Sequence, residues 1–459
     1  MLAVGALGLY VLTPGAGWAE EPAPGKSYVI PAAEIAAFIF ALNQVNRHAL
    51  DSNEYDTDER SFWKNLRSSP TLDKDPFSVN QLGHPYQGSL YYGFARSAGL
   101  EYWESLLYSI GGSLRWEISG ETTRPSLNDH IATGIGGSFV GEAMFRMASL
   151  LLENGGPDPG ILREIGAAVL SPPTGFNRLA FGERFRTVFP SRDPAIFVRL
   201  RVGATLTTSA TNEGAPANVK RQEGSADFSM AYGLPGKPGY TYTRPFDYFL
   251  FEFTAVPNAS TVSNGIENVT IRGLLLGTNY EWGGDYRGVW GLFGGYDYLS
   301  PQLFRVATTN LSLGTTSQWW LSRTVALQST ALVGVGFGAA GTVADEDERD
   351  YNYGVIPQVI LGLRVILGER AMIEASGRQY YVGGVNVNDR LGQEIISRGN
   401  VGVTVRVLGP HALGLQWMRS TRDASSLGVR DRHQAVETVT LSYNFIGHTR
   451  FGAVEWRRD

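Results

Sequence analysis

The chain contains no cysteine. The absence of thiols excludes disulfides, thiolate zinc sites and a cysteine nucleophile. Charged residues are also scarce, because they form 18% of the 459 residues, whereas a typical soluble protein has about 25%. The net charge of -5 leaves no broad basic surface, so no nucleic-acid partner is expected. Beyond the N-terminus no apolar run reaches about 18 residues, which argues against a protein built from many membrane-spanning helices.

Residues 1–19 have the pattern of a secretory signal peptide. An apolar run near the start ends at Pro14 and is too short to anchor the chain in a bilayer. The small residues Gly17 and Ala19 precede a cleavage point at Glu20, at the spacing that signal peptidase prefers. The alternative is a buried N-terminal helix. The signal-peptide interpretation predicts an exported bacterial protein whose mature chain begins near Glu20.

The chain is predicted to divide near residue 190. Segment 20–82 is expected to hold a helix at 31–48 and a polar loop over 51–80, and segment 83–190 to form a helical domain. Apolar side chains at helical spacing predict the further helices 86–97, 101–119, 126–153 and 160–169. Ser126 followed by Asp129 predicts a capping box at the start of the third of these. The glycines at 134, 136, 137 and 141 predict that the helix 126–153 packs closely against the helix 101–119, as helices in or against a membrane do.

After residue 190 the pattern alternates between apolar and polar side chains, which is the period of a β-strand. The strand candidates are 196–207, 227–232, 246–256, 268–280, 286–297, 303–313, 319–337, 355–365, 371–381, 400–407, 411–418 and 438–445. Strands of about 10 alternating residues, rich in glycine and aromatic side chains, are the signature of a transmembrane barrel. A soluble sandwich shows the same alternation over shorter strands.

Two further features favour the membrane barrel. Tight connections alternate with long ones, as periplasmic turns and outer loops do, with exceptions at 233–245 and 298–301. Tryptophans stand near predicted strand ends, which fits an interfacial girdle: Trp282, Trp290, Trp319, Trp320, Trp417 and Trp456. The acidic run at 345–350 is expected to be a solvated outer loop. We therefore expect residues 191–459 to form an all-β transmembrane barrel of about twelve antiparallel strands, which follows an N-terminal α-helical domain.

The alternation also assigns the two faces of the barrel. Val401, Val403 and Val405 are expected to face lipid. The residues expected to line the lumen are Arg199, Arg201, Arg364, Glu374, Arg378 and Arg406. An inner face rich in arginine would favour anionic groups. The closing strand is expected to end at Phe445 or to be shifted to 448–456.

The helical segment carries several multi-residue motifs in order. They are HPYQG at 84–88, ARS at 95–97, WES at 103–105, SLND at 126–129 and SPPTGFNRL at 171–179. In these motifs the chain resembles a bacterial domain-of-unknown-function family of outer-membrane proteins, in which such a segment precedes a C-terminal β-barrel. The resemblance covers roughly residues 30–190. It implies an exported outer-membrane protein and no known activity.

Four polar residues of the helical domain are candidates for a catalytic or metal site: His84, Glu117, Glu121 and Asp129. Glu117 and Glu121 share one helix face, where like charges raise a pKa, and a histidine with carboxylates can bind a divalent ion of unknown identity. The sequence has no HExxH, GxSxG or paired CxxC motif, which weakens the catalytic interpretation. The alternative for Asp129 is a structural role, in which its negative charge interacts favourably with the positive N-terminal end of a helix dipole. Convergence of the four side chains within about 4 Å around an open cleft would favour an enzyme.

Other charged residues of this domain have structural interpretations. Glu142 and Arg146 are four residues apart and are expected to form an ion pair on one helix. Arg96 is expected to pair with Glu101 or Glu104 across the adjoining corner.

The predicted function is that of a bacterial outer-membrane β-barrel protein with a transport, lipid-handling or envelope-assembly role and no cofactor. The helical domain would plug the lumen or dock on the barrel from the periplasmic side. The expected partners are outer-membrane lipid and lipopolysaccharide, with envelope proteins as further candidates, and the oligomeric state is left open. The alternative function is an envelope enzyme that modifies lipid or glycan with His84 and the carboxylates.

Overall fold

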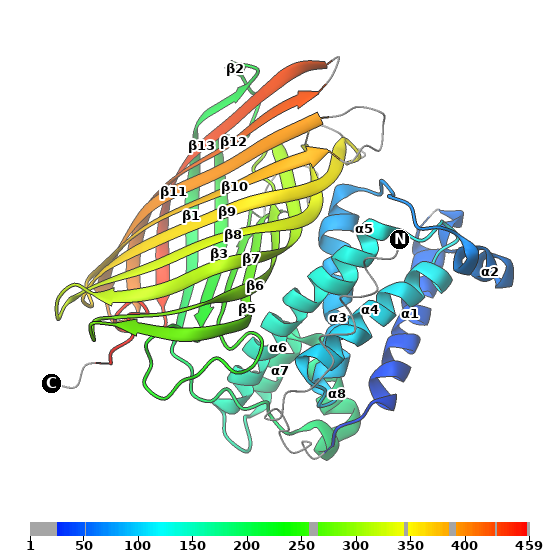
Figure 1. Cartoon of the computed structure of the whole chain (residues 1–459), viewed down its shortest axis with the longest axis horizontal. Coiled ribbons are helices and arrows are strands. Elements are labelled where there is room, and N and C mark those ends of the chain that lie inside the picture. Colours follow the sequence, from blue (N-terminus) through cyan, green and yellow to red (C-terminus); the bar gives the residue numbers. More distant parts are fainter. Residues whose placement is uncertain are drawn as a thin grey trace.

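The computed structural model describes residues 25–50, 52–256, 265–343, 348–384, 392–426 and 429–456. Helices occupy the N-terminal part of this chain and a β-barrel the C-terminal part (Figure 1). The predicted signal peptide lies outside the described residues.

The helical part resembles the prediction with two additions. Its elements are α1 (Val29–Ala49), η1 (Asn53–Tyr55), α2 (Glu59–Arg67), η2 (Val79–Gly83), α3 (His84–Ser97), α4 (Tyr102–Ser119), α5 (Leu127–Asp129), η3 (His130–Gly136), α6 (Gly137–Glu153), α7 (Ile161–Leu170), α8 (Pro172–Phe181) and η4 (Gly182–Phe185). The segment 51–80, predicted as a loop, contains α2, which begins with a capping box between Asp58 and Ser61. The second addition, α8, begins with two prolines, which the first turn of a helix tolerates.

The barrel consists, within the described residues, of twelve strands in one closed sheet. They are β1 (Ile196–Asn212), β3 (Gln222–Tyr232), β4 (Phe249–Ala255), β5 (Ile266–Trp282), β6 (Tyr286–Leu299), β7 (Phe304–Trp320), β8 (Val325–Thr342), β9 (Tyr351–Leu367), β10 (Ala371–Gly384), β11 (Gly392–Leu408), β12 (His411–Ser426) and β13 (Val429–Ile446). Each pairs antiparallel with its neighbours in sequence order, and β13 closes on β1 with Phe445 opposite Leu200. A two-residue strand, β2 (Ala215–Pro216), pairs only with β1. The predicted fold is confirmed.

The alternation along the strands separates an apolar outer wall from a polar interior. Val401, Val403 and Val405 of β11 are exposed on the outside, whereas the intervening Thr404 is buried. The tryptophans divide into two groups. Trp282, Trp290, Trp319 and Trp417 are exposed, as a girdle requires, but Trp320 and Trp456 are buried at one mouth of the barrel.

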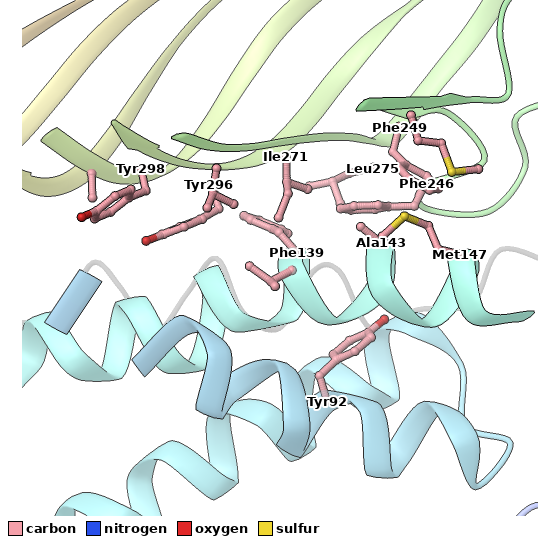
Figure 2. Close-up of a cluster of buried hydrophobic side chains, with 14 of the residues drawn as sticks. Tyr92, Phe139, Ala143, Met147, Phe246, Phe249, Ile271, Leu275, Tyr296 and Tyr298 are labelled. Carbon is pink, nitrogen blue, oxygen red and sulfur yellow. The ribbon is translucent and has the colours of Figure 1, made fainter. Parts of the chain in front are cut away.

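The helical domain docks on the outer wall of the barrel. Figure 2 shows Phe139, Ala143 and Met147 of α6 against Ile271 and Leu275 of β5. The same buried cluster includes Tyr296 and Tyr298 of β6, Ala307 of β7, Ala339 of β8, and Tyr351 and Tyr353 of β9. The register places these barrel residues on the outer face. The described helices therefore lie beside the barrel and do not plug its lumen, which corrects that part of the prediction.

The segment after β13 closes the mouth of the barrel that carries the tight turns. Phe451, Ala453, Val454 and Trp456 are buried there against inward residues of the strand ends. Residues 448–456 therefore do not form the closing strand, which is β13. The reason is that the wall is already complete at Ile446, so the apolar side chains that follow can be buried only inside the mouth. We call residues 448–456 the tail.

The acidic run at 345–350 lies partly outside the described residues. Of its acidic residues the structure describes Asp350, which is exposed as expected, and Glu348, which is buried. The Glu348 carboxylate accepts a hydrogen bond from the Ser78 amide at 2.8 Å, and its backbone carbonyl accepts one from Phe77 at 3.0 Å. At Glu348 the expectation of a solvated loop is wrong, because the residues just before η2 cover it.

Candidate functional site

The barrel encloses a cavity of about 210 Å³. Its lining is polar and strongly charged. The charged residues around it are Arg199, Arg201, Arg272, Arg364, Arg378, Arg398, Asp227, Glu252, Glu267 and Glu374. Asp297, which pairs with Arg272 and Arg378 directly behind this lining, is a fifth carboxylate. Six arginines therefore face five carboxylates, so the wall carries a small excess of positive charge. Apolar side chains such as Phe197, Leu250 and Leu332 complete the lining.

Ion pairs cross the lumen and tie opposite walls together. Arg199 of β1 contacts Glu374 of β10 at 2.9 Å, and Arg398 of β11 contacts Glu267 of β5 at 2.7 Å. Neither pair joins neighbouring strands. Two other pairs, Arg201–Asp227 and Arg272–Asp297, join neighbouring strands. The cavity is the space left between these pairs.

Arg364 differs from the other cavity arginines, because it forms no salt bridge within the described residues. Its guanidinium donates to the Gln328 side chain at 3.1 Å and to the backbone carbonyl of Phe451 at 3.2 Å. It also lies 4.3 Å from the centre of the Phe197 ring. Arg364 therefore joins the cavity wall to the tail.

Side chains from the barrel wall hold the tail in place. Gln318 exchanges two hydrogen bonds with the backbone of Val454, at 2.7 and 2.9 Å. The Gln328 amide donates to the carbonyl of Gly452 at 2.8 Å. Arg406, expected to line the lumen, instead donates to the carbonyls of His448 and Thr449 at this mouth, at 2.8 and 2.9 Å. The wall thus satisfies backbone groups that the tail buries.

The structure places the other five predicted lumen residues, Arg199, Arg201, Arg364, Glu374 and Arg378, at the cavity. Sequence reasoning missed five charged residues of the lining, namely Glu267, which directly precedes the predicted strand 268–280, and Asp227, Glu252, Arg272 and Arg398. Each belongs to a strand whose alternation is interrupted by small or apolar residues. Counting charged residues at even spacing from a clear strand, such as Glu252 between Leu250 and Thr254, would have found them.

The four catalytic candidates of the helical domain do not meet around a cleft. Only His84 and Asp129 approach each other, with His84 Nε2 3.7 Å from Asp129 Oδ1, and both side chains are buried. Burial lowers the pKa of His84 to about 4, so its imidazole is neutral near pH 7. Asn128 donates to Asp129 at 2.8 Å and to the hydroxyl of Tyr353 on β9 at 2.7 Å. This cluster therefore ties the helices to the barrel wall.

Asp73 and Asn80, which sequence reasoning missed, complete this cluster. The Asp73 carboxylate accepts hydrogen bonds from Asn80 at 2.9 Å and from Asn128 at 3.0 Å. Burial opposes its ionisation, but hydrogen bonds from Asp129, Asn128 and Asn80 outweigh burial and lower the pKa of Asp73. Both residues lie in the segment predicted as a loop, where no period marked them as buried.

Glu117 and Glu121 are satisfied separately. The Glu117 carboxylate accepts a hydrogen bond from the backbone of Ser126 at 2.7 Å, and that of Glu121 accepts one from the Trp116 indole at 2.7 Å. Burial and the nearby Glu54 carboxylate raise the pKa of Glu121 to about 8. Within the described residues no group of His, Asp and Glu side chains has metal-binding geometry.

A buried charge network joins α3, α6 and the barrel. Glu142 accepts hydrogen bonds from Arg96 and Arg146, both at 2.8 Å, and Arg146 contacts Asp247 at 2.9 Å. The predicted pair of Glu142 and Arg146 is confirmed. The prediction for Arg96 is wrong, because its guanidinium points into the α3–α6 interface and not across the corner to Glu101 or Glu104. Every charge of the network has an opposite partner, which burial requires.

Comparisons with known proteins add a family likeness for the helical part. Residues 69–173 match the model of a family described as a domain of unknown function, DUF3943. This match covers most of the segment on which the resemblance in sequence rests. No curated protein matches the chain.

Several solved outer-membrane barrels align with part of the chain. The channel DcaP of Acinetobacter baumannii is 8% identical and covers 55% of this chain and 96% of its own, with a TM-score of 0.26. The toluene transporter TodX of Pseudomonas putida is 10% identical, and the alignment covers 56% of this chain and 90% of TodX, with a TM-score of 0.24. An anion-selective porin from Comamonas acidovorans is 10% identical, and the alignment covers 55% of this chain and 98% of the porin, with a TM-score of 0.23. The fold of this chain rests on its own strand pairing.

Proposed function

We propose that the protein is a bacterial outer-membrane channel that admits small charged solutes, with a preference for anions, through the lumen of its barrel. The observation that carries this proposal is the charged cavity inside a closed twelve-strand wall, where six arginines face five carboxylates and Arg364 has no acidic partner within the described residues. An excess of cationic side chains in a confined space raises the local concentration of anions.

The outer wall supports the placement in a membrane. Its exposed residues are mainly Val, Leu, Ile and aromatic side chains on successive strands, as in Val401 and Leu415 on adjacent β11 and β12. Water would not favour so large an apolar band, whereas acyl chains would. Outer-membrane lipid and lipopolysaccharide are then the surrounding partners.

The tail supports a closed resting state. It fills the mouth with the tight turns, which corresponds to the periplasmic end in outer-membrane barrels. A solute that enters from the opposite mouth would reach the arginines and stop at the tail. The channel would conduct when the tail leaves this mouth.

The test is ion selectivity in planar bilayers under a KCl gradient. A chain shortened to end at Gly447, which lacks the tail and in which the lumen variants are made, should give a reversal potential displaced toward that of chloride. Arg364→Gln removes a cation without breaking a salt bridge and should reduce this displacement, whereas Glu252→Gln should increase it. Arg419→Gln, on the exposed outer wall, is the matched control and should not change the reversal potential. Cation selectivity, or the absence of any response to both lumen variants, would contradict the proposal.

A further inference from the structure

Two helices of the docked domain, α4 and α8, bury polar side chains and expose apolar ones. In α4 the buried face includes Ser105, Ser109 and Ser113. The exposed face carries Trp103, Leu107, Gly111 and Leu114, which recur at helical spacing, and also Arg115 near its C-terminal end. We call the first four of these residues the α4 stripe. Leu107 is 64% exposed and Leu114 50%. A helix on the surface of a water-soluble protein has the opposite arrangement.

Helix α8 repeats this inversion. In α8 Thr174 and Asn177 are buried, while Phe176 and Leu179 are exposed. The exposed side of α7 carries Ile161, Leu162, Ile165 and Val169. In the interior of the domain lie the paired charges of Glu142, Arg96 and Arg146. Polar ties and small residues inside, with aliphatic side chains outside, are the pattern of helices packed within lipid.

The α4 stripe is continuous with the outer wall of the barrel through η3. Gly136 lies so close to β7 that an added Cβ would be 2.5 Å from the Thr309 hydroxyl. Further along β7, Leu311 and Leu313 are exposed on the same outer face as Thr309. The preceding residue, Ile135, is exposed. Gly134 approaches Ile110 of α4, where an added Cβ would be 3.3 Å from that side chain. An apolar strip therefore runs from β7 across η3 to α4.

We infer that the α4 stripe contacts the acyl chains of the bilayer, so that the helical domain lies within the membrane beside the barrel. The inference rests on the proposed function in one respect, namely that the barrel spans a membrane. A wall surrounded by lipid can be covered on its side only by a domain that itself enters the lipid. The aliphatic faces of such a domain favour lipid over water, and the buried charges of Glu142, Arg96 and Arg146 are already paired in its interior.

The absence of cysteine allows a direct test with single spin labels. Leu107→Cys reports on the α4 stripe, Val403→Cys on the outer barrel wall, and Arg323→Cys on an exposed turn. Each labelled full chain is reconstituted in vesicles of phosphatidylcholine and phosphatidylglycerol. Collisions with oxygen, which concentrates in acyl chains, are compared with collisions with a water-soluble nickel chelate. The oxygen-to-nickel ratio at position 107 should equal that at 403 and exceed that at 323 several-fold.

Three outcomes would overturn the inference. A water-like ratio at 107 beside a lipid-like ratio at 403 would place the stripe outside the bilayer while leaving the proposed function intact. Low collision rates with both reagents at 107 would mean that a second copy or another protein covers it. A water-like ratio at 403 would remove the membrane barrel and, with it, the premise. Leu114→Cys gives an independent repeat on the same face.

Discussion

At the residue scale, Glu142 is the residue on which the stability of the buried charge network depends most. Its carboxylate is the common partner of Arg96 and Arg146, and all three side chains are buried. Glu142→Gln would leave the buried guanidinium of Arg96 without its counter-charge and that of Arg146 with Asp247 alone, which costs about 3–5 kcal/mol. We expect a lower melting temperature of the helices, followed by far-ultraviolet circular dichroism. Glu183→Gln, which breaks the exposed pair with Arg186, is the control and should have no measurable effect.

Glu121 gives a pH-dependent prediction. Its folded-state pKa of about 8 lies above the ordinary value of 4.5, because burial and Glu54 disfavour the charged form. For an acid with a raised folded-state pKa, the stabilisation is complete below the unfolded value and is lost as pH rises between the two values. The melting temperature should therefore fall between pH 4.5 and about 8. In Glu121→Gln this fall should be smaller, and an unchanged slope would contradict the assignment.

The charged residues show how far sequence reasoning reaches at this scale. Glu142 and Arg146 were predictable as a pair, because both lie four positions apart on one helix. The partner of Arg96 was not, because Glu142 is 46 residues away and only the packing of α3 on α6 joins them. The same limit applies to Arg406, whose even spacing indicates the inner face but not that the tail lies beside it.

At the element scale, local signals predicted most helices and strands. Close packing through glycine was also predictable, but only one of its two partners was. The expected contact was between the helices 101–119 and 126–153. In the structure Gly134 approaches α4, whereas an added Cβ on Gly137 would lie 2.6 Å from the Cα of Gly88 in α3. Glycines mark a helix that another backbone approaches, and many helices can supply that backbone.

The tail is an element with no period in its sequence, and its removal gives a prediction. A chain that ends at Gly447 lacks the hydrogen bonds that Val454 and Gly452 make with Gln318 and Gln328. The mouth should then be open, so the mean single-channel conductance should rise above that of the full chain. A chain that ends at Trp456 keeps the tail and should behave as the full chain does. Equal conductance of all three chains would show that the tail does not obstruct the lumen.

At the scale of the whole molecule, the barrel was predictable and the docking of the helices was not. Alternation specifies which face of a strand is apolar, and tight turns specify antiparallel neighbours, so the closed wall follows. It does not specify what an apolar outer face meets. Ile271 and Tyr296, which contact the helices, have the same character in sequence as Val403, which is exposed. Lipid and a docked helix accept the same side chains, because both exclude water.

The orientation of the wall leads to a prediction for assembly of the whole protein. Val403 is exposed on the outer face of β11, between Leu415 of β12 and Ile373 of β10. An arginine on the lipid-facing side near the middle of a membrane barrel costs about 2–4 kcal/mol. Val403→Arg should therefore reduce the yield of heat-modifiable, folded barrel in vesicles, whereas Val403→Leu should not. In detergent micelles, where the arginine can reach water, the loss should be smaller. A Val403→Arg chain that assembles as well as Val403→Leu in vesicles would mean that this face does not meet lipid.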